Sequence, residues 1–476
     1  MLAVVSRASF WIDEAGTAFF AGQATLGQWW HAVCVAHTTE VQMPFYAVYL
    51  WAFAKLFGVG EVPLRLAGAI WLIPGLTAFV VSFPRGGRRL AALAAAATNA
   101  FIWYYANEAR TYSMQLGGSF LLLAALNRLA SSPISPTEEK RWLWCFVLGL
   151  LVVCGTSMLG MIWASAALGA AWVLFPAERL LGWWRMARFG WVSLTVLLAA
   201  LGCYYVWTVH LGARGSDVGT TDWRTTVFLL YDQLGFEGLG PGRIALRAQG
   251  PKALVPFAPG LLSCAAMLAV IFFFALKEAW RLSPRKLAGM AAAVLAPWLF
   301  LSLVGVVTHF RLLGRHSAPL VPIWLFLIAE GAALLAAKPG WIGRIIVGVF
   351  LSLSLFSSLS VRFAYRQSKE DYRRAANLAA AALAERRGVW WSADELTARY
   401  YHLPASDSPV APETALLMLN PTDAAMEGLK PPQIIFVSRP ELYDRFGALA
   451  RYMAGHGFHA TTTFPAFEIW TAPPSK

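Results

Sequence analysis

The residues of this chain that could do chemistry are carboxylates, cations and hydrogen-bonding rings placed at the ends of apolar segments. They are Asp13, Glu14, Glu40, Glu108, Arg110, Tyr112, Arg315 and His316. A carboxylate can take the proton of an attacking hydroxyl group, and a guanidinium offers paired donors that match phosphate oxygens. The set therefore suits transfer of a group from a lipid phosphate, and it suits transport of an anion equally well.

Two of these groups have plainer interpretations beside the chemical one. Asp13-Glu14 follows Phe10-Trp11 after one residue, Ile12, at a point where an aromatic anchor at a membrane interface is expected. The acidic pair could therefore simply end an apolar segment among lipid headgroups. Glu108 and Arg110 occupy a short turn between apolar blocks, where ionisable groups usually face a protein cavity. Arg110 could instead extend to headgroup phosphates.

The elements that must position these residues are membrane-spanning helices. The chain has 476 residues, of which 58% are hydrophobic and 14% are charged, whereas soluble domains average about 45–50% and about 25%. Apolar blocks of about 16–24 residues match a hydrocarbon core about 30 Å thick. A soluble fold would leave many all-round apolar helices uncovered. The chain is therefore predicted to be an α-helical polytopic membrane protein.

We predict about 11 spans. Residues 1–6 are apolar but too short to cross, so either the first span is truncated or the chain begins at the membrane surface. We favour truncation, and about 12–20 further apolar residues are then expected to be encoded upstream of Met1. Residues 43–58, interrupted by Pro44 and Lys55, predict a helix that lies on the membrane surface. The complete spans are predicted at 63–82, 90–106, 111–130, 142–160, 161–176, 189–209, 254–276, 287–307, 317–337 and 344–361.

The net charge is +13, and the placement of the basic residues predicts how these spans are oriented. Lysine and arginine gather in alternate short loops, which the positive-inside rule assigns to the cytoplasm. These loops are 84–89, 131–141, 176–188, 277–286 and 338–344. The complementary loops then face outward, and Arg311, Arg315 and His316 form an outward basic cluster that would bind either an anionic substrate or lipid headgroups. Because the basic residues lie in short loops between predicted spans, they do not indicate a nucleic-acid partner.

The residues after 361 change in character. We predict a polytopic domain at 1–361 and a small extracytoplasmic α/β domain at 362–476. Its expected elements are a helix that opens with a capping box at Ser368 and runs to Gly388, strands at 389–391 and 433–438, a second capping box from Ser438, and a strand pair around 458–471.

Signatures of soluble enzymes are absent from the sequence: there is no phosphate-binding loop, no dinucleotide fingerprint, no HExxH and no GxSxG. The five cysteines include no CxxC pair, so neither a disulfide framework nor a zinc knuckle is indicated.

Five segments, in order, resemble the bacterial membrane glycosyltransferases of the GT-C class, in the group related to protein O-mannosyltransferases and lipid A aminoarabinose transferases. They are SFWIDEAGTAFFAG (9–22), PFYAVYLWAFAKLFGVGEVPLRLAGAIW (44–71), YYANEARTYSMQL (104–116), GRHSAPLVPIW (314–324) and KEDYRRAA (369–376). The resemblance runs over nearly the whole chain.

The resemblance implies an inverting transfer of a sugar from a polyprenyl-phosphate donor to a lipid, protein or polysaccharide acceptor. The site would face outward from the bacterial cytoplasmic (inner) membrane. Asp13 would be the general base, and Glu14 would position the acceptor or donor. The other implied substrate-binding residues are Glu40, Glu108, Arg110, Tyr112, Arg315 and His316. The alternative is a transporter or flippase of anionic or sugar-linked lipids, which should contain two related halves with broken helices; the sequence has no such repeat.

Three departures from the family pattern leave the sugar, the acceptor and any metal open. Gln42-Met43-Pro44 stands where His-Pro-Pro is usual, Glu40 where Asp is common, and His316 in place of Tyr. Some relatives bind a divalent metal near the first-loop carboxylates, so Glu14, His37 and Glu40 are candidate ligands. No other cofactor is implied.

Overall fold

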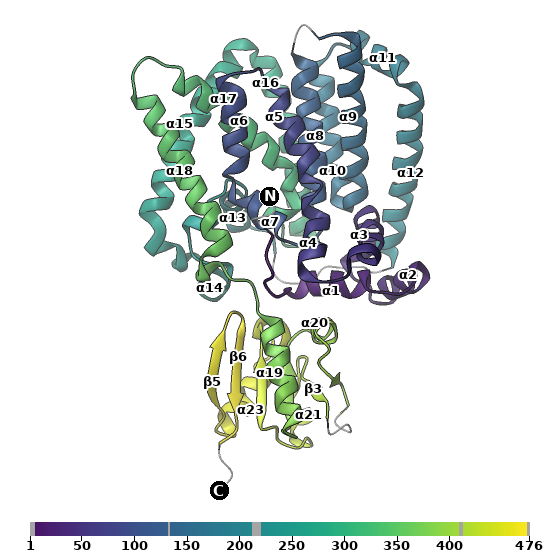
Figure 1. Cartoon of the computed structure of the whole chain (residues 1–476), viewed down its shortest axis with the longest axis vertical. Coiled ribbons are helices and arrows are strands. Elements are labelled where there is room, and N and C mark those ends of the chain that lie inside the picture. The colour runs from purple at the N-terminus through teal and green to yellow at the C-terminus, as the bar shows by residue number, and fades with distance from the viewer. Residues whose placement is uncertain (1–4, 132–133, 212–219, 409–412, 474–476) are drawn as a thin grey trace. The chain divides into compact units, whose positions relative to one another are not determined.

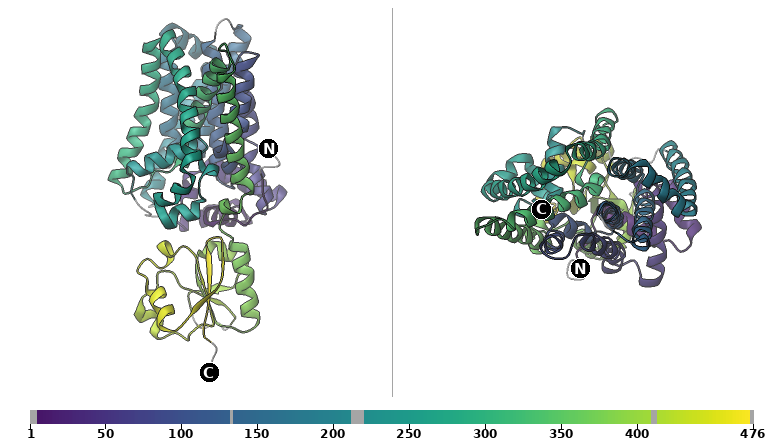
Figure 2. Two further views of the ribbon diagram at one scale, coloured as in Figure 1. Left: turned by 90° about the vertical axis from the view of Figure 1, so that its left-hand side faces the viewer. Right: turned by 90° about the horizontal axis from the view of Figure 1, so that it is seen from above.

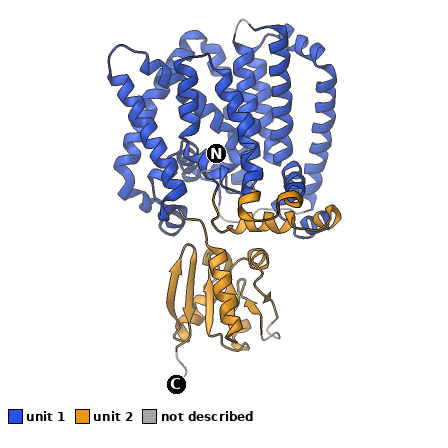
Figure 3. Cartoon of the chain, viewed as in Figure 1, with its two compact units in different colours: residues 1–5, 30–53, 65–367 blue, residues 6–29, 54–64, 368–476 orange. Residues whose placement is uncertain are grey.

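The computed structural model describes residues 5–131, 134–211, 220–408 and 413–473. The chain forms two compact units (Figure 3). Unit 1 is drawn from residues 1–5, 30–53 and 65–367, and unit 2 from residues 6–29, 54–64 and 368–476. Each unit therefore combines segments that are distant in sequence.

Long helices that run roughly side by side make up most of unit 1 (Figures 1 and 2). The longest are α8 (Tyr112–Ala130), α9 (Pro136–Thr156), α10 (Met158–Leu174), α12 (Arg188–His210), α15 (Ala258–Leu282), α16 (Pro284–Val307), α17 (Val321–Ala336) and α18 (Ile342–Phe363). Within the described residues, six helical stretches are long and apolar enough to cross a membrane. They are Glu61–Ser82, Arg188–His210, Arg243–Leu282, Pro284–Val307, Gly314–Ala336 and Ile342–Phe363. The prediction of a helical membrane protein is confirmed, with at least six candidate spans.

Shorter helices connect and flank the long ones. They are α2 (Leu26–Val35), η1 (Thr39–Gln42), α3 (Pro44–Phe57), α4 (Glu61–Ala69), α5 (Leu72–Ser82), α6 (Gly87–Ala97), α7 (Ala100–Ala106), α11 (Ala177–Met186), α13 (Trp223–Gln233), η2 (Glu237–Leu239), α14 (Arg243–Gln249), η3 (Gly250–Phe257), η4 (Gly314–Leu320) and η5 (Tyr365–Gln367). The helix expected at 43–58 is α3, and its 14 residues reach about 21 Å, less than the hydrocarbon thickness.

Three predicted spans cross a break between two helices. The stretch 63–82 is divided between α4 and α5, which together still count as one candidate span, and the stretch 90–106 is divided between α6 and α7. The stretch 142–160 crosses the break at Ser157 between α9 and α10. The second break has a local cause. Asn99 caps α7, its side chain accepting the Ile102 backbone N–H at 3.1 Å, and an asparagine cap starts a new helix rather than continuing the old one.

Glycines let α5 and α8 approach closely. A Cβ added at Gly75 would overlap the backbone of Gly117, and one added at Gly117 would overlap the carbonyl oxygen of Trp71. Small residues are the usual means of close helix packing in membranes, where hydrophobic burial between helices contributes little. The two glycines thus fix the packing beside the turn that carries Glu108 and Arg110.

The C-terminal part of unit 2 is a six-stranded mixed sheet in the order β2-β3-β1-β4-β6-β5. Pairs among β1–β4 are parallel, and β4–β6 and β5–β6 are antiparallel. The unit's elements are α1 (Ile12–Ala21), α19 (Tyr372–Ala384), β1 (Val389–Ser392), α20 (Glu395–Tyr400), β2 (Ala405–Ser406), β3 (Ala415–Leu417), α21 (Asp423–Glu427), β4 (Ile434–Val437), α22 (Pro440–Tyr443), α23 (Ala448–Gly455), β5 (His459–Phe464) and β6 (Phe467–Thr471).

Alternating residues of β1 and β4 face two apolar layers. Trp391 and Phe436 pack with α19, whereas Trp390 and Ile435 pack with α23. The sheet is therefore covered by helices on both faces, as an α/β domain requires. The predicted C-terminal α/β domain and its strands are confirmed.

Both predicted capping boxes in this domain are wrong. Helix α19 is capped by Asp371, not Ser368, with the Asp371 side chain accepting the Arg374 backbone N–H at 3.2 Å. Helix α22 is preceded by Arg439 in a left-handed conformation, with no side-chain cap from Ser438. Asp371 directly precedes α19, and Pro440 is the first residue of α22. Both lie nearer to the first helical turn than the serines do, and they set where the two helices begin.

Candidate active site

The acidic pair lies in the first turn of α1, in unit 2. A helix N-terminus favours negative charge, which suits Asp13 and Glu14 there. The Asp13 backbone carbonyl accepts the Thr17 hydroxyl at 2.9 Å, and its side chain is half-buried. Glu14 is fully buried, with the Lys369 ammonium 3.6 Å from its carboxylate. The half-buried Asp13 is thus the member of the pair that can meet a substrate.

The turn between α7 and α8 holds a second group, in unit 1. Glu108 and Arg110 are 1% and 4% exposed, so this turn is buried inside the protein and not extended into headgroups. Arg110 donates to the carboxylate of Glu40, from η1, which is itself buried. A Cβ at Gly68 would lie 3.4 Å from the Glu108 carbonyl oxygen, so the turn also packs on α4.

Tyr112, Arg315 and His316 adjoin one another in unit 1. The Arg315 guanidinium lies 5.7 Å from the centre of the Tyr112 ring, and the His316 ring lies 4.8 Å from that of Phe310. The His316 Nδ1 accepts the Leu313 backbone N–H at 3.1 Å, so this ring nitrogen helps to shape η4. Arg315 is therefore the more suitable of the two for contact with an anion.

Sequence reasoning missed a buried ionic cluster in unit 1. Asp232 and Glu237 are 2% and 1% exposed, and both bind the guanidinium of Arg243, with Asp232 at 3.0 Å. The same guanidinium lies 3.7 Å from the centre of the Tyr104 ring. Burial raises the pKa of Asp232 well above its ordinary value, although Arg243 opposes the shift. The sequence signal that could have revealed this cluster was the presence of charged residues close to predicted spans.

This cluster adjoins the loop that carries Arg315. The Gln233 side-chain amide donates to the Gly314 carbonyl at 3.0 Å and to the Ser317 carbonyl at 2.8 Å. A Cβ at Gly314 would overlap the Asp232 carboxylate, so only a glycine fits there. The loop between α12 and α15 therefore fixes the backbone on either side of Arg315.

A fully buried arginine was also missed. Arg65, in α4, has no exposed surface. Arginines are seldom fully buried, and those within apolar spans usually face the protein interior, where other polar groups can meet them. The signal was present in the sequence as an arginine within the Leu-Arg-Leu run of a predicted span.

Two of the three residues expected as metal ligands are held in ion pairs. Glu14 pairs with Lys369, and Glu40 pairs with Arg110. Over the described ranges, no three His, Cys, Asp or Glu side chains gather as metal ligands do. We accordingly assign no step of the reaction to a metal.

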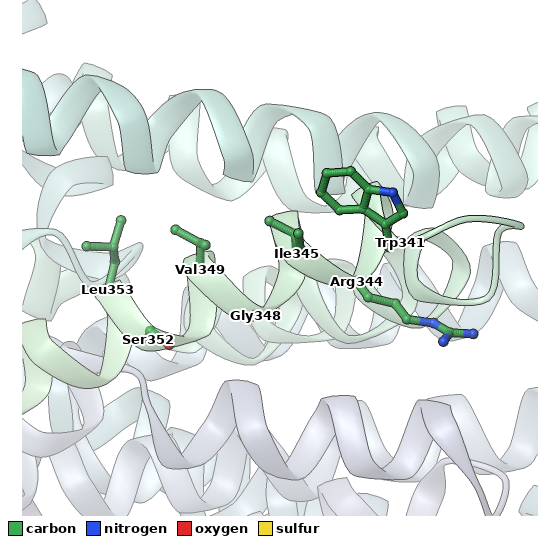
Figure 4. A pocket seen from close by; sticks show the side chains of 7 residues that line it. All are labelled: Trp341, Arg344, Ile345, Gly348, Val349, Ser352 and Leu353. Atoms are coloured by element: carbon green, nitrogen blue, oxygen red, sulfur yellow. The ribbon is translucent and has the colours of Figure 1, made fainter.

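A cavity of about 500 Å³ lies along α18. Figure 4 shows apolar side chains along one side of this helix, with Arg344 directed differently. Its lining residues are Trp341, Arg344, Ile345, Gly348, Val349, Ser352 and Leu353. None of the site residues predicted from the sequence is among them, so this cavity is separate from the candidate active site.

Known structures share the fold of the chain. ArnT from Cupriavidus metallidurans in the apo state is 12% identical, with a TM-score of 0.55, over 99% of this chain and 96% of that one. Also similar are the same ArnT bound to undecaprenyl phosphate (13% identity, 99% and 96% covered, TM-score 0.49) and the arabinofuranosyltransferase AftD from Mycobacteria (14% identity, 99% and 38% covered, TM-score 0.45). No protein-family model and no curated protein sequence matches the chain. The predicted likeness to GT-C membrane glycosyltransferases is confirmed at the level of fold.

Proposed function

We propose that the chain is a membrane glycosyltransferase that moves a sugar from a polyprenyl-phosphate donor to an acceptor hydroxyl, with inversion. The observation that carries the proposal is the ArnT-like fold over 99% of the chain. The ordered sequence segments that resemble the same class support it independently. Because one fold can host several functions, the activity must also be consistent with the residues of the site.

Asp13 is the proposed general base. The acceptor oxygen attacks the anomeric carbon, its proton passes to the Asp13 carboxylate, and the bond between that carbon and the phosphate oxygen breaks. Polyprenyl phosphate leaves with the bonding electrons and an added negative charge. The half-burial of Asp13 supports this role, because a base must be reachable and still held in place.

Arg315 is the proposed partner of the donor phosphate. Arg110 is already bound by Glu40, so we assign this pair to holding the turn between α7 and α8 in place rather than to the phosphate. Glu108, Tyr112 and His316 would line the substrate site. A guanidinium meets the charge that grows on the leaving phosphate, and so acts mainly on the transition state.

Two domains would take part in the reaction. Residues 1–361 would form the catalytic membrane domain, with about 11 spans. Residues 362–476 would form an extracytoplasmic domain, so that the site faces outward from the bacterial cytoplasmic membrane. The acceptor would be a lipid, a protein or a polysaccharide.

The proposal is tested in proteoliposomes that contain labelled polyprenyl-phosphate sugars and an acceptor extract, with products followed by mass spectrometry. Wild-type protein should yield free polyprenyl phosphate and a glycosylated acceptor. Asp13→Asn should reduce turnover by about 10²–10⁴-fold with little change in donor binding. Asp423→Asn, at a carboxylate that is 60% exposed, is the matched control and should remain active. If the donor crosses the bilayer chemically unchanged, the transporter alternative replaces the enzyme.

A further inference from the structure

The segment that leads into α1 is fixed on the C-terminal domain. The Phe10 backbone N–H donates to the Tyr401 hydroxyl at 2.7 Å, and the Ser9 hydroxyl lies 3.1 Å from the same oxygen. The Arg373 backbone N–H donates to Ser9 at 3.0 Å. The Phe10 ring also lies 5.3 Å from that of Tyr400. These contacts join residues nearly 400 positions apart.

Helix α1 itself packs on the same domain. It lies against α20, where a Cβ at Gly16 would stand 3.8 Å from the Leu396 side chain. Ile12 packs against the apolar core on the α19 face of the sheet. Asp13 and Glu14 are therefore carried by the C-terminal domain, although they lie more than 350 residues before it in the sequence.

Lys369 joins this domain to the acidic pair. Its ammonium lies 3.6 Å from the Glu14 carboxylate, and the two side chains are 10% and 0% exposed. A buried carboxylate without a compensating charge is costly, so the pair stabilises Glu14 in its ionised form. The next residue, Glu370, reaches the other way, to the Arg439 guanidinium at 3.8 Å. The segment before α19 thus links α1 to the end of β4.

Asp394 adds a further carboxylate at the end of β1. It caps α20, accepting the Thr397 backbone N–H at 2.7 Å and the Thr397 hydroxyl at 2.6 Å, and it accepts the Tyr443 hydroxyl at 3.3 Å. Burial raises the pKa of Asp394, and the Asp13 carboxylate contributes to the same shift. Asp13, Glu14 and Asp394 are thus three acidic side chains of unit 2, and Lys369 pairs with Glu14 among them.

We propose that Lys369 is a positioning residue for the reaction: by holding Glu14 it fixes the first turn of α1 and with it the Asp13 carboxylate. The inference rests on the proposed function and adds that residues of the C-terminal domain hold the proposed base in place. A misplacement of about 1 Å at a reacting group costs about 10²-fold in rate, which sets the size of the expected effect.

The test compares Lys369→Met, Lys369→Arg and the control Lys430→Met, at an exposed lysine of the same domain. Lys369→Met should lower kcat/KM by about 10²-fold. The loss should fall mainly on kcat, with KM changed little, because the position of the base matters for the chemical step rather than for donor binding. Lys369→Arg keeps the charge and should recover most of the wild-type kcat. Lys430→Met should match wild type throughout.

A second measurement is independent of activity. Thermal midpoints of wild type, Lys369→Met, Glu14→Gln and the double variant form a double-mutant cycle in the full chain. Lys369→Met should lower the midpoint, and adding Glu14→Gln should restore part of the loss. With an active wild type, a wild-type kcat in Lys369→Met together with zero coupling overturns the positioning role alone. A wild type that transfers no sugar overturns the proposed function and the catalytic role of Lys369, while the cycle still reports whether the two side chains pair.

Discussion

Arg315 is the residue on which the phosphate chemistry depends most. Replacing it with Lys keeps the charge but removes the paired donors, so turnover should fall clearly, and replacement with Ala should cost about 10²–10³-fold. Donor affinity should change less, because the charge it meets grows in the transition state. Arg311→Ala, at an exposed arginine of the same loop, is the matched control. Equal losses of turnover in Arg311→Ala and Arg315→Ala would indicate that Arg315 contacts lipid headgroups rather than the donor phosphate.

The types of the site residues could be predicted, but their partners could not. The turn residues Glu108 and Arg110 were recognised from their place between apolar blocks. That Arg110 binds Glu40, 70 positions away, follows only from the position of η1 beside the turn between α7 and α8. Arg243 was missed because its two carboxylate partners, Asp232 and Glu237, gather through a loop with no periodic pattern.

The close packing of α5 on α8 depends on single glycines. Gly117→Ala should destabilise the protein, since its Cβ would overlap the Trp71 carbonyl oxygen and force the two helices apart. Overpacking of this kind costs about 1–3 kcal/mol. Gly202→Ala, in α12, has open space around it and should be neutral or slightly stabilising, as alanine favours helices. Thermal unfolding in detergent measures both, and equal midpoints would contradict the close approach.

Hydropathy predicted where helices lie better than where they break. The long apolar stretches from α8 to α18 follow the predicted spans closely, because burial in lipid demands length and apolarity. The interruption at Asn99 depends on one side-chain hydrogen bond and left no trace in the average hydropathy. In the C-terminal domain β1, β4, β5 and β6 were predicted from apolar runs, whereas the short strands β2 and β3 were not. The helix caps depended on which neighbouring polar group reached the first turn.

The division of the whole molecule could not be predicted from local sequence. Residues 6–29 belong with residues 368–476 in one compact unit, which depends on contacts such as that between Ser9 and Tyr401, 392 positions apart. The sequence resemblance placed both segments in one family of enzymes but gave no reason for them to pack together. The surroundings of the candidate base Asp13 therefore depend on contacts between residues 6–29 and residues 368–476, and the first loop alone does not reveal them.

The charges of the loops predict how the whole molecule is oriented in the membrane. The basic loops at 84–89 and 277–286 should lie in the cytoplasm, because lysine and arginine are retained on that side. Gly87→Cys and Pro284→Cys should therefore resist an impermeant thiol reagent in intact cells, whereas Ser408→Cys should react. All three positions are exposed, and the five native cysteines are first replaced by alanine. Permeabilised cells, in which every reporter should react, provide the control. Labelling of the first two positions from outside would reverse the orientation, and the proposed site would then face the cytoplasm, where an extracytoplasmic acceptor could not reach it.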